Sequence, residues 1–236
     1  KENKRILMIT SLIILLPVLV GLLLWHQLPE QIPVHFNSEG VADSYQSKLW
    51  GVTFIYLVIF ACHWFAAIIT SVDPRRKNIS GKIYRLVLWI CPVVSVFVGV
   101  TIYGTALNWP WVNINFMANL LLGVIFIVIG NYLPKCRQNY TIGIKLPWTL
   151  SDTENWDRTH RFAGKIWMLC GVLEIIVGFL PIAQFEIVTI ALILLATIPI
   201  AVYSYLFYRK RWDRESGDCV NIFGVFHQFE NYRGKL

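Results

Sequence analysis

The sequence is poor in charge. Only 15% of its 236 residues are Asp, Glu, Lys or Arg, whereas 56% are hydrophobic, and a soluble domain usually carries about 25% charged residues. The few charges are also unevenly spread, so that long windows contain almost none. A helix that crosses the hydrocarbon core of a bilayer needs about 20 such residues. The composition therefore argues against an ordinary soluble domain and indicates a membrane protein.

Six apolar windows are long enough to span a bilayer. Because lipid offers no hydrogen-bond partner to the backbone, each window is expected to be an α-helix, and none shows the alternation of a membrane-barrel strand. The first window is too long for a signal peptide, and no small-residue cleavage site follows it. The predicted fold class is all-α, a polytopic helical membrane protein with six transmembrane helices. The windows are 6–25, 49–72, 86–107, 114–133, 162–181 and 187–208.

The basic residues outside these windows predict how the chain is oriented. If the N-terminus is cytoplasmic, all but one of the 21 Lys and Arg residues fall on the cytoplasmic side, and only Lys48 lies outside. This asymmetry is the positive-inside pattern, which an odd number of helices would destroy. We therefore expect both termini inside (N-in/C-in). The net charge of +7 makes anionic membrane lipid an expected partner, and direct binding of nucleic acid is not expected.

Cysteine is scarce as well, and familiar catalytic motifs are missing. None of the five cysteines falls in a predicted outer loop and no C-x-x-C occurs, which argues against a disulfide framework and a zinc knuckle. The sequence contains no H-E-x-x-H, G-x-S-x-G, Walker or G-x-G-x-x-G pattern. We therefore expect no catalytic residues, no metal site and no cofactor, and the protein is not predicted to be an enzyme.

Against this apolar background, residues 28–48 form a polar segment between the first two windows. Pro29 and Pro33 restrict its backbone, and Asn-Ser-Glu-Gly at positions 37–40 is typical of a turn. The simplest interpretation is a hairpin that connects two helices. Alternatively, its polar side chains form a surface that meets something outside the cell, although their spacing matches no metal site. These side chains are His35, Asn37, Glu39 and Asp43.

A second unusual segment, residues 134–165, is predicted to be cytoplasmic and is dense in Trp, Pro and Gly. Ser151, followed by Glu154 three positions later, predicts a helix start at which Ser151 is the cap and from which the chain enters the fifth window. Trp148 and Trp156 are typical of interfacial anchors at headgroup depth. That interpretation does not explain the residues clustered with them. They are Gly143, Lys145, Pro147 and Thr149.

These two segments resemble the SdpI family, bacterial membrane proteins named for immunity to a sporulation-delaying killing peptide. The cytoplasmic segment carries the resemblance at Asn139, Gly143-Ile144-Lys145, Pro147-Trp148-Thr149-Leu150, Trp156, His160 and Gly164. The outer segment resembles a module often found ahead of that family, at Leu28-Pro29, Ile32-Pro33, His35-Phe36-Asn37, Gly40 and Asp43.

The resemblance implies two roles for a multi-pass protein of the bacterial cell (plasma) membrane. One is protection of the producing cell against a secreted peptide toxin outside. The other is signalling, in which the protein holds a small winged-helix repressor at the membrane when toxin is present. We divide the chain into a two-helix module (1–72) with an outer loop (26–48), a four-helix SdpI-like domain (73–211) with a cytoplasmic motif loop (134–165), and a tail (212–236).

For signalling, the motif loop is the predicted repressor surface, because large aromatic residues and arginine dominate binding hot spots. The residues in question are Lys145, Trp148, Trp156, Arg158 and His160.

Glu174 is the one ionisable acid deep inside a window. It is expected to point into the bundle, with Asn119 as its first candidate partner and His63 as the second. Glycine recurs every seven residues on the same helix face, which allows a neighbouring helix to approach closely. These glycines are Gly164, Gly171 and Gly178. The fourth window offers a matching stripe at Asn115, Asn119, Gly123 and Asn131.

These intramembrane residues have two interpretations. Their amides and glycines hold helices together, or they surround a polar pocket or pathway at Glu174. The second interpretation suits the alternative function, a small-molecule or proton-coupled transporter. A third function is an intramembrane enzyme of unknown chemistry that would use His35, His63 or Glu174.

Overall fold

The computed structural model describes residues 2–37, 40–180 and 185–212. Within them, six helices are long and apolar enough to cross a membrane, and each overlaps one predicted window. The prediction of an all-α protein with six spans is therefore confirmed. Beyond Trp212, the predicted tail lies outside the described residues. The spans are Asn3–Leu23, Lys48–Ser71, Gly81–Ala106, Ile114–Lys135, Thr153–Phe179 and Glu186–Trp212.

Short elements join these helices. A β-hairpin connects the first two helices, and a five-residue helix precedes the fifth span. The last span begins as α7 and continues, after a turn at residues 196–197, as a helix over residues 198–212. The elements in chain order are α1 (Glu2–Leu23), β1 (Gln31–Phe36), β2 (Ala42–Ser47), α2 (Lys48–Ser71), η1 (Arg76–Asn78), α3 (Gly81–Ala106), α4 (Ile114–Tyr132), η2 (Leu133–Lys135), α5 (Pro147–Ser151), α6 (Thr153–Phe179) and α7 (Phe185–Leu195).

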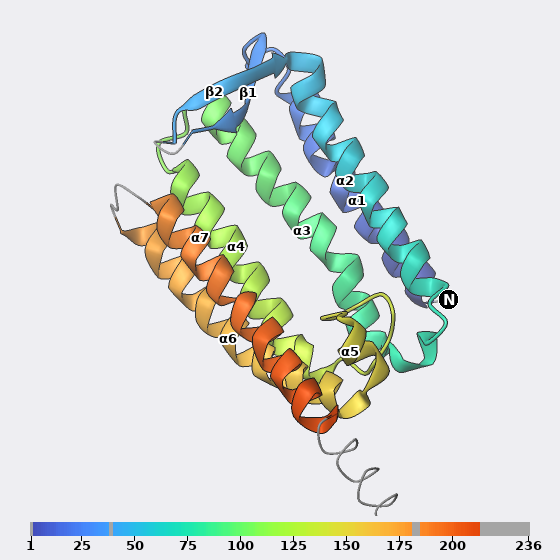
Figure 1. Cartoon of the computed structure of the whole chain (residues 1–236). Helices are drawn as coiled ribbons and strands as arrows, with labels where there is room; N and C mark the ends of the chain where they lie inside the picture. Colours follow the sequence, from blue (N-terminus) through green and yellow to red (C-terminus); the bar gives the residue numbers. More distant parts are fainter. Residues whose placement is uncertain (1, 38–39, 181–184, 213–236) are drawn as a thin grey trace, which may run out of the picture.

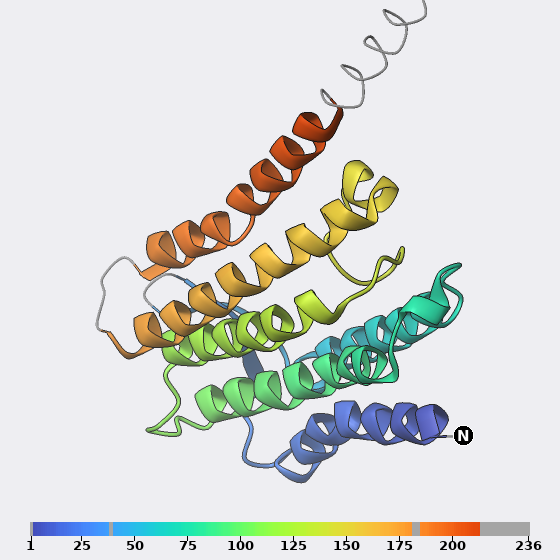
Figure 2. The ribbon, with the colours of Figure 1, turned by 90° about the horizontal axis from the view of Figure 1, so that it is seen from below.

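The spans form two groups of three. In the N-terminal half, α3 packs on α1 and α2, and in the C-terminal half, α6 packs on α4 and α7, whereas α3 and α4 touch only slightly (Figures 1 and 2). The hairpin lies at one end of the bundle, here called the hairpin end. The N-terminus and α5 lie at the other, here called the motif end (Figure 1). The domain boundary at residue 72 stays a prediction, but in space α3 lies with the first two helices.

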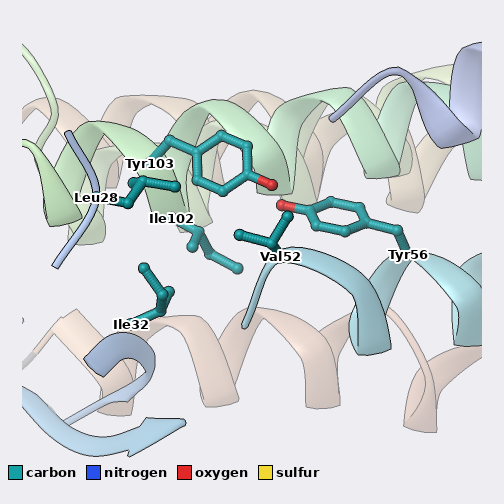
Figure 3. Packing of buried hydrophobic residues seen from close by; sticks show 6 residues of the cluster. All are labelled: Leu28, Ile32, Val52, Tyr56, Ile102 and Tyr103. Atoms are coloured by element: carbon teal, nitrogen blue, oxygen red, sulfur yellow. The ribbon is translucent and has the colours of Figure 1, made fainter. Parts of the chain in front are cut away.

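The hairpin is anchored in the N-terminal half by an apolar cluster (Figure 3). Ile32 of β1 is fully buried, and it packs against Gly51 of α2, where a Cβ would lie 2.5 Å from the Ile32 Cβ. The Tyr103 hydroxyl donates to the carbonyl of Pro17 in α1 (2.8 Å) and points toward the Tyr56 hydroxyl. The cluster consists of Leu28, Ile32, Val52, Tyr56, Ile102 and Tyr103. The hairpin is therefore fixed to the helices by buried apolar contacts.

In the C-terminal half, α4 and α6 are in backbone contact. A Cβ on Gly171 would lie 2.6 Å from the Gly123 carbonyl oxygen, and a Cβ on Gly164 would lie 2.7 Å from the Gly130 carbonyl oxygen. The glycine face expected on α6 is therefore used for close packing. On α4, Gly130 takes the place expected for Asn131, which is exposed, because seven residues return almost to the same helix face and eight do not.

Candidate functional site

Asn139 organises the irregular stretch at the start of the motif loop. Its side chain is buried, its Oδ1 accepts the amide protons of Thr141 (2.9 Å) and Ile142 (2.6 Å), and its Nδ2 donates to the carbonyls of Arg137 (2.8 Å) and Ile142 (3.0 Å). An amide side chain has two donor hydrogens and one acceptor oxygen with two lone pairs, and all are used here. Asn139 is therefore a structural residue whose two kinds of bond no carboxylate or aliphatic side chain can reproduce.

Trp156 and His160 form the floor on which this stretch lies. Both are buried, and their rings stack with centroids 4.1 Å apart. Trp156 Nε1 donates to the Cys136 carbonyl (2.7 Å), and His160 Nε2 accepts the amide proton of Ile144 (2.9 Å). Since that nitrogen must offer a lone pair, the imidazole is neutral and its Nδ1–H donates to the Trp156 carbonyl (2.7 Å).

Position 143, which lies on these two rings, requires glycine for two reasons. Its φ of +119° lies in a region that side-chain-bearing residues rarely adopt, and a Cβ there would lie 2.5 Å from His160 Nε2. Burial also raises the pKa of the neighbouring Cys136 thiol to about 11, so this cysteine stays protonated and unreactive. The floor is a packed core, because the backbone at Gly143 lies directly against both rings.

The following helix, α5, is attached to the last span. Pro147 begins it at the first helical position, where proline is favoured, and Thr149 Oγ1 accepts the amide proton of Leu146 (2.9 Å). Trp148 Nε1 donates to Ser204 Oγ (2.8 Å), and Ser204 in turn donates to Asn155 Oδ1 (2.9 Å). Sequence reasoning identified Trp148, which is half-buried, but missed Ser204 and Asn155, which are fully buried.

Two sequence-based expectations for the motif loop were wrong. The cap of α6 is Asp152, whose carboxylate accepts the amide proton of Glu154 (2.8 Å), whereas Ser151 still belongs to α5 and donates to the Trp148 carbonyl. Trp156 and His160, expected to face a partner protein, are buried and position the loop instead. Lys145 and Arg158 are exposed, with Lys145 Nζ donating to the Thr141 carbonyl (2.9 Å).

The motif loop is also clamped to the N-terminal half. The buried Asp73, in the connection between α2 and α3, accepts the amide proton of Tyr140 (3.0 Å) and the hydroxyl proton of Thr141. Arg75 donates to the Gln138 side chain, and Gln138 Nε2 donates onward to the Thr149 carbonyl (2.8 Å). Asp73 and Gln138 were missed, although Asp73 directly precedes a proline, a pair that marks a turn. This clamp joins the two halves at the motif end.

At the hairpin end, the predicted polar residues mostly shape the hairpin itself. His35 Nδ1 lies 2.6 Å from Asp43 Oδ1 across the two strands, and both side chains are exposed. Asn37 Oδ1 accepts the amide proton of Val41 (2.9 Å), and Gly40 has the positive φ (+74°) that this turn requires. Glu39 lies outside the described residues.

Within the membrane, Glu174 is fully buried and points into the bundle. Thr189 of α7 bridges it to Asn119, because the Thr189 Oγ1 lies 3.2 Å from Glu174 Oε2 and 3.0 Å from Asn119 Oδ1. Asn119 Nδ2 donates to the Asn115 carbonyl (2.8 Å). Asn119 thus belongs to the Glu174 cluster through Thr189, which sequence reasoning missed.

The second candidate partner of Glu174 was wrong. His63 lies in the N-terminal half, where its Nε2 is 3.0 Å from Thr10 Oγ1 of α1. In the described part of the chain, no group of three or more His, Cys, Asp or Glu side chains could hold a metal ion.

Comparisons with known proteins match one segment in each half of the chain. Residues 135–204 match the SdpI/YfhL protein family, and residues 12–60 match a domain of unknown function, DUF1648. The chain is also 26% identical over 207 residues to "Immunity protein SdpI" of Bacillus subtilis (strain 168), a match that covers 86% of this chain and 95% of that protein. No solved structure matches the chain. The family segment contains the motif loop from Lys135, all of α6 and Ser204, and the chain is therefore an SdpI-like membrane protein.

Proposed function

We propose that this protein gives its cell immunity to a secreted antimicrobial peptide toxin from within the bacterial plasma membrane. The observation that carries the proposal is the match to a protein named for immunity, which runs over 95% of that relative. The architecture is compatible with this role. The described residues build a close-packed helical scaffold that carries one exposed hairpin, a form suited to binding a peptide.

The proposed contact for the toxin is the hairpin end. Exposed apolar and aromatic side chains lie there next to the polar His35–Asp43 pair, and aromatic residues are enriched at protein interfaces. A surface of this kind suits an amphipathic or largely apolar peptide. The exposed side chains are Val34, Val41, Tyr45 and Trp111.

Expression of the chain in a strain that is sensitive to the killing peptide and lacks its own immunity gene tests the proposal. We expect survival at peptide concentrations that kill the vector control. Tyr45→Ala, on the hairpin, should reduce this protection, whereas Tyr140→Ala, a similarly exposed tyrosine at the motif end (51% and 45% exposed), should not. If cells with normal amounts of the protein in the membrane are killed by the same peptide concentration as the vector control, the immunity role is contradicted.

The proposed topology follows from the basic residues, which place the hairpin outside and the motif loop in the cytoplasm. In a chain whose five cysteines are replaced by alanine, Ser44→Cys on β2 and Ser151→Cys at the end of α5 are both exposed positions. An impermeant maleimide should label intact cells at Ser44→Cys and should reach Ser151→Cys only after the membrane is opened. The reverse pattern would overturn the orientation.

The second part of the proposed function is signalling through a cytosolic winged-helix repressor that the motif end holds at the membrane. With Trp156 and His160 buried, the exposed Lys145 and Arg158 are the proposed contacts. Their positive charges suit an acidic patch on the repressor, since complementary charge speeds association and fixes register. The buried residues of the loop then position the backbone at Lys145, whereas Arg158 is held by Glu154 (2.9 Å) and by the ring of Phe207.

A further inference from the structure

Three helices meet at Glu174 through polar side chains. Glu174 of α6 and Asn119 of α4 are 0% and 2% exposed, and Thr189 of α7 lies between them. The arrangement is a chain of short steps: Glu174 Oε2 to Thr189 Oγ1 (3.2 Å), Thr189 Oγ1 to Asn119 Oδ1 (3.0 Å), and Asn119 Nδ2 to the Asn115 carbonyl (2.8 Å).

Counting hydrogens along this chain determines the direction of each bond. Asn119 Nδ2 faces a carbonyl, so Asn119 Oδ1 faces Thr189 and must accept. A threonine hydroxyl carries one hydrogen, and that hydrogen is used in the bond to Asn119. The contact between Thr189 Oγ1 and Glu174 Oε2 then lacks a hydrogen unless Glu174 supplies it. Every contact in the chain is satisfied only when Glu174 is a carboxylic acid that donates to Thr189.

The surroundings of Glu174 agree with a neutral carboxyl. Its Oε1 is buried without a hydrogen-bond partner among the described residues, and an ionised carboxylate held there would be costly to bury. The helices around it bring no positive charge to this level: α4 presents Asn115 and Asn119, and α7 presents Thr189. The titratable neighbours are Cys170, four residues earlier on α6, and Glu186, exposed in the first turn of α7.

A polar route leads from this cluster toward the hairpin end. Asn115 lies one helical turn before Asn119, in the first turn of α4, and its Oδ1 is a second buried oxygen without a partner among the described residues. Directly beside it is the hairpin turn, where a Cβ on Gly40 would lie 3.1 Å from Asn115 Oδ1. The two unpartnered oxygens are acceptors positioned for water between the hairpin and Glu174.

We propose that Glu174, Thr189 and Asn119 form an intramembrane proton-binding site that exchanges its proton with water at the hairpin end past Asn115. The ligand is a proton: the carboxylate of Glu174 takes one up to become the acid, whose O–H donates to Thr189, and releases it again without any redox change. This site is separate from the hairpin surface proposed for the toxin, and its test uses no toxin.

Infrared spectroscopy of the purified full-length protein in lipid nanodiscs tests the site directly, because a protonated carboxyl has its own carbonyl band. At neutral pH we expect this band in the parent and in Glu186→Gln, the matched change on the exposed acid of α7, and its loss in Glu174→Gln. Thr189→Val should keep the band but move it toward the position of a carboxyl that donates no hydrogen bond. A parent without the band, or a Glu174→Gln variant that retains it, would overturn the site.

The route has its own measurement. On transfer to heavy water, the carbonyl band of the acid shifts as its proton is replaced by deuterium. Asn115→Leu should retain the band yet slow this shift several-fold, whereas Asn131→Leu, an exposed position near the other end of α4, should leave the rate unchanged. Equal exchange rates in the two variants would exclude entry past Asn115.

Discussion

Gly171→Ala is expected to destabilise the protein by about 1–3 kcal/mol, the usual cost of adding a methyl group to a packed interior. The added Cβ would lie 2.6 Å from the Gly123 carbonyl oxygen and 2.9 Å from the Ile127 amide nitrogen. Both are backbone atoms of α4, so no side chain can rotate away and the two helices must separate. Gly171→Leu should prevent the C-terminal half from assembling. Unfolding of the purified protein by increasing detergent or by heating measures the loss.

Gly81→Ala is the matched control for this change. Gly81 begins α3, and a Cβ there would meet nothing within 4 Å. The same chemical change should therefore be neutral or stabilise by up to about 1 kcal/mol, because it restricts only the unfolded chain. If Gly171→Ala and Gly81→Ala unfold at the same midpoint, α4 and α6 are not in backbone contact.

The six spans could be predicted because the membrane restricts the backbone conformations that an apolar segment can adopt. An apolar window must satisfy its backbone hydrogen bonds internally, and a helix is the way to do so. Which faces of the helices meet is harder to read, since lipid is as apolar as the packed face and apolar periodicity therefore carries no information about contact. Small residues do carry it, so the seven-residue repeat of Gly164, Gly171 and Gly178 correctly indicated the packed face of α6.

The polar residues were harder to place because their partners are distant in sequence. Thr189 follows Glu174 by 15 positions across a connection, and nothing in α7 sets it apart from the threonines that only bond their own helix. Asp73 and Gln138 are 65 positions apart, yet both hold the same loop. The helix α5 could have been found from Pro147, since proline favours the first helical position, and finding it would have moved the predicted cap from Ser151 to Asp152.

The motif residues illustrate a further limit of sequence reasoning. A cluster of Trp, His, Lys and Arg in one short segment has the composition of a binding surface. In the structure the same cluster divides by depth, because Trp156 and His160 are buried whereas Lys145 and Arg158 are exposed. Composition cannot distinguish a residue that contacts a partner from one that supports the contact, because aromatic rings serve both purposes.

Asn139→Ala is expected to open the motif loop, at a cost of about 2–4 kcal/mol. The change leaves the amides of Thr141 and Ile142 and the carbonyls of Arg137 and Ile142 without their partner, and a buried group left unpaired costs about 1–3 kcal/mol. Because the loop lies at an end of the bundle, it can unfold locally while the spans stay folded, and water then forms hydrogen bonds with these backbone groups. Trypsin should therefore cut at Lys145 at least about tenfold faster, since 1.4 kcal/mol is a factor of ten.

Two further variants distinguish residues that support the motif loop from residues that contact the repressor. They are Asn131→Ala and Lys145→Ala. Asn131 is exposed, and among the described residues its Oδ1 accepts only from Lys135 Nζ (3.2 Å), so the same substitution there should leave trypsin cleavage and repressor recruitment unchanged. Lys145→Ala should reduce recruitment of a fluorescent repressor fusion to the membrane while cleavage at Arg137 and stability stay at parental values. Asn139→Ala should abolish recruitment of the repressor and also make the motif loop sensitive to trypsin. If Asn139→Ala opens the loop and the repressor is still recruited, the signalling surface lies elsewhere on the protein, and the buried residues of the motif serve only to join the two halves.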